Sequence, residues 1–522
     1  MNTWFLTFVG LIVSPAFLSA QAGTLDKTFN DTGMVTIPVG SANAIAQALA
    51  VQPDGKIVLA GFASNGSNND FGLTRFNTDG SPDLEFNETG NQLIDFNGTD
   101  DFAEGIAVRP ENGKIIIGGY TFNGSGFDFA LAQYLPDGSP DSFFGTNGRT
   151  TTPVGTNVFA TALGLQHDGR IVMAGYSTQS GNNEFTLGRW LEDGSPDPSL
   201  DEDGIVTTHI GISNSAAFCL LIQPDGKIIV AGQAFNDATL RWEAAIVRYL
   251  EDGTLDQQFG EDGISILTLS NKDLFITAIS LDVNKNIVAA GYTGTSPSNN
   301  NFVLLRFLPD GRPDSLFDED GLLVAPFNGN NNEATSVLTQ PDGKIVIAGH
   351  AEINGTDHFA LARYDQHGLL DPTFGTAGKT TTRIGDFNGL NSLTLAGDGK
   401  ILAAGGAFIG THFEYTICRY HNDLETSTAD MSIPGIGVSV YPNPVTESFT
   451  LNYTLEQNDE LTIRLIDLQG RVITTFGNKI KTAAGLHAQQ FSIPSMLTPG
   501  KYILHITSIT DQATLPIACI RN

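Results

Sequence analysis

The side chains of this chain that could do chemistry are mostly carboxylates, and many recur in pairs four residues apart. Each pair begins with an Asp that precedes a Gly: Asp79 and Asp83, Asp137 and Asp141, Asp193 and Asp197, Asp252 and Asp256, Asp310 and Asp314. Calcium binds several oxygen ligands from one loop, so these pairs make calcium a conceivable cofactor, and no other cofactor is indicated. A structural role explains them better, because Asp before Gly sets a turn and the second Asp can cap backbone amides.

An arginine followed by an aromatic residue also recurs, and Gln133 takes its place in one copy. The arginines are Arg75, Arg189, Arg248, Arg306, Arg363 and Arg419. A ring of exposed guanidinium groups would bind an anionic ligand. We favour the alternative, in which each arginine pairs with a turn Asp between neighbouring repeats.

Two further sets of residues are candidates for a binding or catalytic site. Trp242, with Arg241 beside it, falls in the longest variable loop (residues 234–243), where its indole could stack on a sugar ring or fold onto its own repeat. Acids in the connections between repeats could serve a glycosidase, which needs two carboxylates about 5–10 Å apart. These acids are Asp100, Asp101, Glu104, Asp273 and Glu333. No catalytic motif joins them, so we assign no catalytic and no metal-binding residue.

The elements that must position these residues come from a repeat of roughly 57 residues. The phrase Pro53-Asp54-Gly55-Lys56 returns, with variations, seven times along the chain. In the first full copy, apolar runs at 46–51, 56–61, 71–76 and 93–96 are separated by turns, which predicts four antiparallel strands. Four strands per unit of this length are typical of a propeller blade, with a solenoid of sheets as the alternative.

The two ends of the repeat array favour a closed ring. Residues 25–37 match only the last part of a repeat, which contains its fourth strand. Residues 389–420 match only the first part, which contains the first three strands. The leading strand can therefore complete the last sheet and remove its exposed edge. The sequence thus predicts an all-β fold: a seven-bladed β-propeller of four-stranded blades over residues 23–423, closed by the N-terminal strand.

Ring closure sorts the loops onto two faces. The turns between the first and second strands and between the third and fourth strands are uniform, as at Asp54-Gly55 and Asp79-Gly80. The loops between the second and third strands differ in every repeat, for example residues 63–70 and 293–301. Variation on a repeated frame is typical of binding faces, so we expect the variable face to be the working surface.

The repeats resemble the delta-60 repeat family of bacteria. The matching features are the Leu-Asp-x-x-Phe-Gly phrase (255–260 and 370–375, with Pro for Leu at 140), the Asp-Gly-Lys hairpin and the Phe-x-Leu-x-Arg-Tyr strand at 359–364. The resemblance covers about residues 24–423. It implies a propeller-like β fold and no particular reaction.

The tail resembles the C-terminal sorting domain (type A) of type IX secretion substrates. Its motifs are Tyr441-Pro442-Asn443-Pro444, a strand leading to Asp467 and Gly470, and Pro499-Gly500 followed by Tyr502. The resemblance implies a small β-sandwich over residues 438–522 that the type IX secretion machinery recognises. Residues 424–437 are expected to be a linker. On this basis the protein is secreted or attached to the outer-membrane surface.

Charge and the N-terminus agree with export. The 522 residues carry a formal net charge of −30, which disfavours nucleic acid as a partner and favours a soluble monomer. Residues 1–22 have the apolar core and the Ala20-Gln21-Ala22 cleavage site of a signal peptide. No other segment is long and apolar enough to span a membrane.

Three functions remain open at the level of sequence. The first is a surface-displayed binding or adhesion scaffold whose variable face holds an unknown protein or glycan. The second is an extracellular polysaccharide hydrolase or lyase on a propeller scaffold. The third is a passive spacer or coat protein. The absence of a catalytic motif favours the first and argues against an enzyme.

Overall fold

The structure is a computed structural model in two compact units, Met1–Asp423 and Leu424–Asn522. In the first unit it describes residues 21–423 except 180, 212, 296–298, 328 and 330. In the second it describes residues 436–441, 448–455, 459–466, 472–483, 485–493, 500–507 and 512–519. Among these residues no helix is long and apolar enough to cross a membrane.

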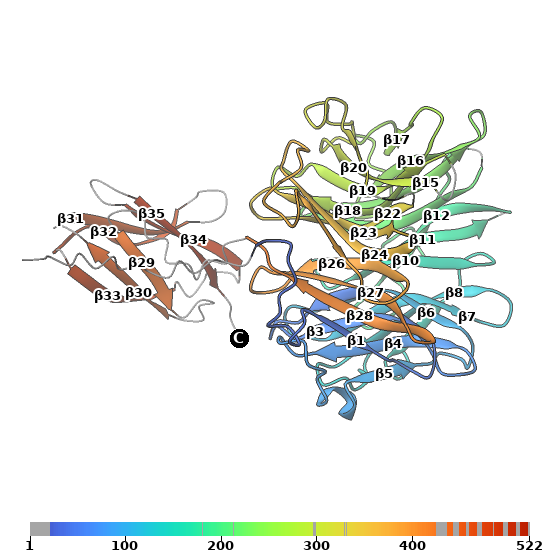
Figure 1. Cartoon of the computed structure of the whole chain (residues 1–522), viewed down its shortest axis with the longest axis horizontal. Coiled ribbons are helices and arrows are strands. Elements are labelled where there is room, and N and C mark those ends of the chain that lie inside the picture. Colours follow the sequence, from blue (N-terminus) through green and yellow to red (C-terminus); the bar gives the residue numbers. More distant parts are fainter. Residues whose placement is uncertain are drawn as a thin grey trace, which may run out of the picture. The chain divides into compact units, whose positions relative to one another are not determined.

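The first unit consists of seven four-stranded antiparallel sheets, the blades of a propeller (Figure 1). Blades 1 to 3 are β2 (Ala44–Val51), β3 (Ile57–Ser64), β4 (Asn69–Phe76), β5 (Asn91–Ile94); β6 (Asp101–Val108), β7 (Ile115–Phe122), β8 (Phe127–Tyr134), β9 (Arg149–Thr152); β10 (Val158–Leu165), β11 (Ile171–Gln179), β12 (Asn182–Trp190), β13 (Ile205–Thr208). Blades 4 and 5 are β14 (Ser215–Ile222), β15 (Ile228–Asn236), β16 (Arg241–Tyr249), β17 (Ile264–Leu267); β18 (Asp273–Leu281), β19 (Ile287–Gly294), β20 (Asn300–Phe307), β21 (Leu322–Ala325). Blades 6 and 7 are β22 (Asn332–Thr339), β23 (Ile345–Ile353), β24 (Thr356–Tyr364), β25 (Lys379–Thr382); β26 (Asn388–Leu395), β27 (Ile401–Ile409), β28 (His412–Tyr420), β1 (Met34–Ile37). The described part of the propeller has one helical element, the 3-10 turn η1 (Phe86–Glu88).

The N-terminal strand closes the ring, as the sequence predicts. β1 pairs antiparallel with β28, from Met34 opposite Cys418 to Ile37 opposite Tyr415. The first strands of neighbouring blades contact one another in an unbroken series that returns from β26 to β2. Ala22 is buried in the blade 7 core, and its carbonyl accepts a hydrogen bond from the Gly375 amide. The predicted wheel of seven blades is therefore confirmed.

The hydrophobic core lies between the blades rather than within any one of them. One cluster joins Phe71, Phe86 and Ile94 of blade 1 to Ile115 and Tyr134 of blade 2. The second and third strands of a blade are buried on both faces, which explains their continuous apolar runs. Because each blade is covered only by its neighbours, the repeats fold as one ring.

A β-bulge interrupts the pairing of the first and second strands in every blade. A glycine faces each bulge: Gly61, Gly119, Gly175, Gly232, Gly291, Gly349 and Gly405. A Cβ atom on Gly61 would lie 2.0 Å from the carbonyl oxygen of Ile45, so only glycine fits there. The bulged residues are Gln47, Glu104, Thr161, Phe218, Thr277, Thr335 and Asn391.

The second unit is a β-sandwich. One sheet has the order β29 (Ile436–Tyr441), β30 (Ser448–Leu455), β33 (Gly485–Ser492); the other has the order β32 (Val472–Thr482), β31 (Asp459–Ile466), β34 (Gly500–Thr507), β35 (Gln512–Cys519). Phe449 and Leu451 of the first sheet pack with Ile463 and Leu504 of the second in one buried core.

Candidate functional site

The structure shortens the loops expected on the variable face. The second and third strands extend towards each other, so the loops between them cover only residues 65–68, 123–126, 180–181, 237–240, 295–299, 354–355 and 410–411. The long connections lie instead between the third and fourth strands, as at residues 77–90. The expected contrast between short turns and longer variable loops is therefore wrong for the connections between the third and fourth strands. The loops between the second and third strands are short, and the strand ends beside them carry the variation.

The recurring arginines are buried, and each one pairs with a carboxylate. The distances from Arg Nε to Asp Oδ2 lie between 2.6 and 2.9 Å for Arg75–Asp83, Arg189–Asp197, Arg248–Asp256, Arg306–Asp314, Arg363–Asp371 and Arg419–Asp26. In these six pairs the Asp belongs to the same blade as the arginine, so the expectation of an Asp between neighbouring blades is wrong for them. Arg363 meets that expectation as well, because it also pairs with Asp423 of the next blade. The link to the next blade is a guanidinium donor to a turn carbonyl, such as Pro309 O for Arg248.

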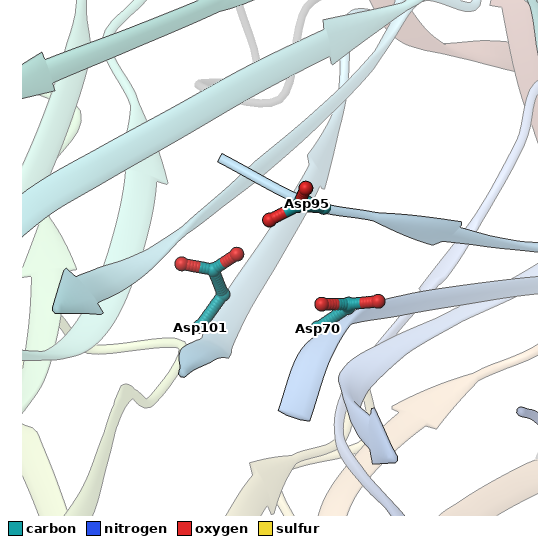
Figure 2. Close-up of side chains that lie close together, drawn as sticks. All are labelled: Asp70, Asp95 and Asp101. Carbon is teal, nitrogen blue, oxygen red and sulfur yellow. The ribbon is translucent and has the colours of Figure 1, made fainter. Parts of the chain in front are cut away.

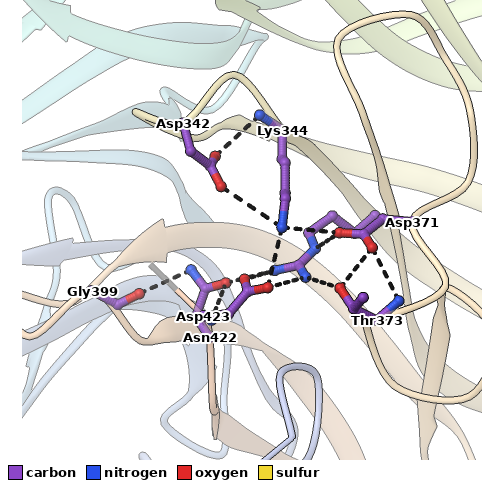
Figure 3. Close-up of polar contacts among 8 residues, drawn as sticks. Asp342, Lys344, Asp371, Thr373, Gly399, Asn422 and Asp423 are labelled. Atoms are coloured by element: carbon purple, nitrogen blue, oxygen red, sulfur yellow. Dashed lines mark hydrogen bonds and ion pairs between the residues drawn. The ribbon is translucent and has the colours of Figure 1, made fainter. Parts of the chain in front are cut away.

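Blade 6 shows the complete arrangement (Figure 3). Lys344 Nζ lies 3.2 Å from Asp371 Oδ2 and 3.1 Å from Asp423 Oδ2, and Arg363 pairs with both of these aspartates. Burial raises the pKa of Asp371, but hydrogen bonds from Thr373 and Lys344 and the charge of Arg363 outweigh it and lower the pKa to about 2. These groups satisfy one another, so the ring of arginines stabilises the frame and offers no free anion site.

Blade 2 keeps the same interaction with the two residues exchanged. In blade 1, Arg75 in the third strand donates to Gln52, which follows the first strand. In blade 2, Arg109 stands at the position of Gln52 and Gln133 at the position of Arg75. Arg109 Nε donates to Gln133 Oε1 at 3.0 Å, and Arg109 Nη1 donates to Gly169 O in blade 3 at 2.9 Å. The exception at Gln133 is therefore a swap that preserves the inter-blade link.

The paired turn carboxylates have structural partners. Asp79 Oδ1 accepts hydrogen bonds from the Ser81 amide and hydroxyl, which builds the turn. Asp83 accepts from the Glu85 amide as well as from Arg75 and Lys56. These contacts match the structural role expected for the pairs.

Trp242 lies at the start of β16 and not in a loop. The half-buried indole packs edge-on against Phe235, with ring centroids 5.2 Å apart. The Trp242 amide donates to Asp273 Oδ1 at 3.0 Å, and Arg241 Nη1 lies 3.5 Å from Asp273 Oδ2. The structure thus joins Arg241 and Trp242 to one of the acids considered for catalysis.

A pocket of about 270 Å³ opens beside Trp242, at strand ends of blades 4, 5 and 6. Its lining consists of Trp242, Asp273, Phe275, Tyr292, Gly294, Asn300 and Glu333. The Phe275 and Tyr292 rings are stacked with centroids 4.6 Å apart. Asn300 Nδ2 donates to Glu333 at 2.7 Å. The pocket is near the lower end of the range for small-molecule sites and suits a single ring-sized group.

The pocket lies at a level of the blades where the residue types change from blade to blade. In each blade, one residue of the first strand faces one residue of the second strand at the position of Phe275 and Tyr292. From blade 1 to blade 7 these pairs are Ile45–Phe62, Phe102–Tyr120, Phe159–Tyr176, Ala216–Gln233, Phe275–Tyr292, Glu333–His350 and Gly389–Gly406. An aromatic pair, Phe275–Tyr292, therefore lies next to a glutamate–histidine pair at the border of blades 5 and 6. His350 Nε2 lies 3.9 Å from Glu333 Oε2 there.

The other acids considered for catalysis are scattered. Asp100 Oδ1 accepts from the Asn69 amide, which is the role that Asp273 plays towards Trp242. Asp101 begins β6 and lies near Asp70 and Asp95. Glu104 occupies the bulge of β6, where burial raises its pKa to about 8 although a hydrogen bond from Gln47 lowers it.

The sorting motifs are only partly within the described residues. Tyr441 ends β29, Gly500 begins β34, and Tyr502 is buried in the sandwich core. Pro442, Asn443, Pro444, Asp467, Gly470 and Pro499 lie outside the described residues.

Comparison with known families identifies both units. Six segments match a family described as a domain of unknown function (DUF5122) beta-propeller: residues 52–86, 111–144, 166–200, 223–259, 284–317 and 340–374. Residues 439–517 match the secretion system C-terminal sorting domain. Six segments of the propeller therefore match DUF5122 repeats, consistent with the delta-60 resemblance. The chain carries a type IX sorting domain, and the protein is secreted or attached to the outer-membrane surface.

Several solved structures resemble the chain at low identity. PorZ, a surface component of the type IX secretion system of Porphyromonas gingivalis, shares 13% identity over 90% of this chain, which spans 58% of the PorZ chain, with a TM-score of 0.34. A protein of unknown function from Dyadobacter fermentans shares 11% identity over 74% of this chain and 98% of its own, with a TM-score of 0.40. Sqt1 from Chaetomium thermophilum shares 10% identity over 75% of this chain and 98% of its own, with a TM-score of 0.40. None of these similarities bears on function, and no curated protein matches the chain.

Proposed function

We propose that the protein is an exported binding or adhesion protein and that its propeller holds a saccharide in the pocket beside Trp242. The supporting observation is the composition of that pocket. Three aromatic rings, of Trp242, Phe275 and Tyr292, lie with the carboxylates of Asp273 and Glu333. The apolar face of a sugar ring packs on aromatic rings, and its hydroxyls donate to carboxylates.

The repeat supplies a matched control for the test. Phe127 of blade 2 corresponds to Trp242, because it packs against Phe122 as Trp242 packs against Phe235. After a glycan array has identified a ligand, we expect Trp242→Ala to weaken binding roughly tenfold or more, equivalent to about 1.4 kcal/mol. Phe127→Ala should change the affinity less than twofold. Equal affinities of the wild type and Trp242→Ala would contradict the proposal.

A hydrolase or lyase is the second candidate, because Asp273 and Glu333 line one pocket. Asp273→Asn separates the roles: Asn157 and Asn214 occupy the same slot in blades 3 and 4 and accept the same amide hydrogen bond. If the wild type releases reducing ends from the bound polysaccharide and Asp273→Asn and Glu333→Gln do not, the protein is an enzyme. Binding without release supports the scaffold.

A further inference from the structure

Three carboxylates from three segments converge where blade 1 meets blade 2, and they point toward one another (Figure 2). Asp70 lies in β4, Asp95 follows β5, and Asp101 begins β6. Each places an oxygen within 4.8 Å of the other two. Asp70 and Asp101 are 3% and 0% exposed, whereas Asp95 is exposed, so the cluster is reachable from solvent.

Two of these acids depart from the repeat. The residues in the Asp101 slot of the other blades are Ala44, Val158, Ser215, Leu274, Asn332 and Asn388, and those in the Asp95 slot are Pro38, Pro153, His209, Thr268, Pro326 and Arg383. None is acidic. Asp70 is ordinary by comparison, since Asp128, Glu184, Glu243 and Glu414 fill its slot elsewhere. The common fold therefore explains Asp70 but neither Asp95 nor Asp101.

One oxygen of the buried Asp101 carboxylate is poorly hydrogen-bonded. Oδ2 accepts a hydrogen bond from the Phe96 amide at 2.9 Å. Oδ1 is buried and, among the described residues, has no partner with normal hydrogen-bond geometry; the Thr121 side chain beside it across the hairpin gives it a weak hydrogen bond. The neighbouring cation is Arg149, whose Nη1 donates to the backbone carbonyl of Asp95 rather than to a carboxylate. A buried, poorly hydrogen-bonded carboxylate oxygen among like charges needs a compensating ligand.

We propose that Asp70, Asp95 and Asp101 bind one divalent cation of the calcium type. Calcium–oxygen bonds are about 2.3–2.6 Å, so two ligands of one ion are at most about 4.6–5.2 Å apart, which the cluster satisfies. An all-oxygen set favours calcium or magnesium over zinc. With few protein ligands, we expect a Kd of about 10⁻⁴–10⁻³ M, as in extracellular modules.

The test compares thermal unfolding and calorimetric titration of the chelator-treated full chain with added CaCl₂ or MgCl₂. We expect 10 mM CaCl₂ to raise Tm by a few degrees, because the ion binds the folded state. Asp101→Asn should abolish the calcium shift and raise the metal-free Tm, since Asn332 and Asn388 show that the slot accepts asparagine. Asp128→Asn, the equivalent of Asp70 in blade 2, should leave the shift unchanged.

Three results would overturn the proposal. The first is no change in Tm and no heat of binding with either ion at 10 mM. The second is a calcium shift that survives in Asp101→Asn, which would place the ion elsewhere on this acidic surface. The third is a larger response to magnesium than to calcium, which would refute the choice of ion.

Discussion

Glu104 is the one acid among the bulged residues around the ring, where threonine occurs in three blades. Its charge contributes to the raised pKa values of Tyr120, Tyr176 and Tyr415, which places these three rings around it. Because burial raises the pKa of Glu104 to about 8, the side chain is protonated at neutral pH. A protonated carboxyl at this position acts as a neutral hydrogen-bonding group.

The pH dependence of stability tests this state. The folded protein keeps the Glu104 proton between its usual pKa of 4.5 and about 8, while the unfolded chain loses it. The free energy of unfolding therefore falls as pH rises through this window and levels off above it. Burial also raises the pKa of Asp101, to about 6, so the range from pH 6 to 8 separates Glu104 from this second buried acid. In urea unfolding, the free energy of unfolding of Glu104→Gln should change less between pH 6 and pH 8 than that of the wild type. Equal pH dependence of the two proteins would contradict this.

The exchange of Arg109 and Gln133 predicts a recoverable pair of substitutions. Arg109→Gln alone removes the link to Gly169 in blade 3 and should cost about 1–3 kcal/mol. Gln133→Arg alone places two guanidinium groups together and should also destabilise. The double variant recreates Gln52 and Arg75 of blade 1 and should recover most of the loss in urea unfolding. Additive effects of the two substitutions would show that the pair is not coupled.

At the scale of elements, repetition made the fold predictable. Seven copies of one hairpin and two incomplete ends predicted the four-stranded blades and the closing role of β1. The strand ends were less predictable: polar residues such as Asn69 and Arg241 look like loop but continue the hairpins, because strands pair beyond the apolar core. The pocket was not predictable, because it joins residues from 242 to 333 that only ring geometry brings together.

A signal for these sites does exist within the sequence. Asp95 and Asp101 are acidic in slots that hold no other acid, and Trp242 takes a slot that holds no other tryptophan. The sequence shows which residues differ from their equivalents in the other repeats. It does not show which residues of the next blade they contact. The same limit applied to the arginines: an Asp partner was predicted, but it belongs to the same blade, as for Arg75, and only Arg363 adds an Asp of the next blade among the described pairs.

The closing strand gives a prediction at this scale. Deleting residues 21–37 exposes the edge of β28 and removes Phe29 and Val35 from the core. An exposed edge promotes association between chains. We expect a lower thermal midpoint and loss of the monomer peak in size-exclusion chromatography. A chain ending at residue 423 serves as the control for truncation as such. Unchanged midpoint and elution of the 21–37 deletion would contradict the closure.

At the scale of the whole molecule, the sorting domain and the proposed binding pocket belong to separate units. The sorting domain has its own core, with Tyr453 and Tyr502 buried in it. A chain that ends at residue 423 should fold but fail to leave the periplasm through the type IX machinery. Cell fractionation in a host with that system, with protease resistance as the check on folding, measures this. Arrival of the truncated chain at the surface would contradict the assignment.

The central claim is that the pocket of blades 4 to 6 binds a saccharide, and its tryptophan reports on it directly. Beyond Trp4 in the predicted signal peptide, the chain has two tryptophans, Trp190 and Trp242. Trp190 is buried and its Nε1 donates to Thr152 Oγ1 at 3.0 Å, so it is an internal control. In an ¹⁵N–¹H titration with the saccharide, we expect the Trp242 indole signal to move and the Trp190 signal to stay. Saturable binding that leaves the Trp242 signal in place would contradict the account.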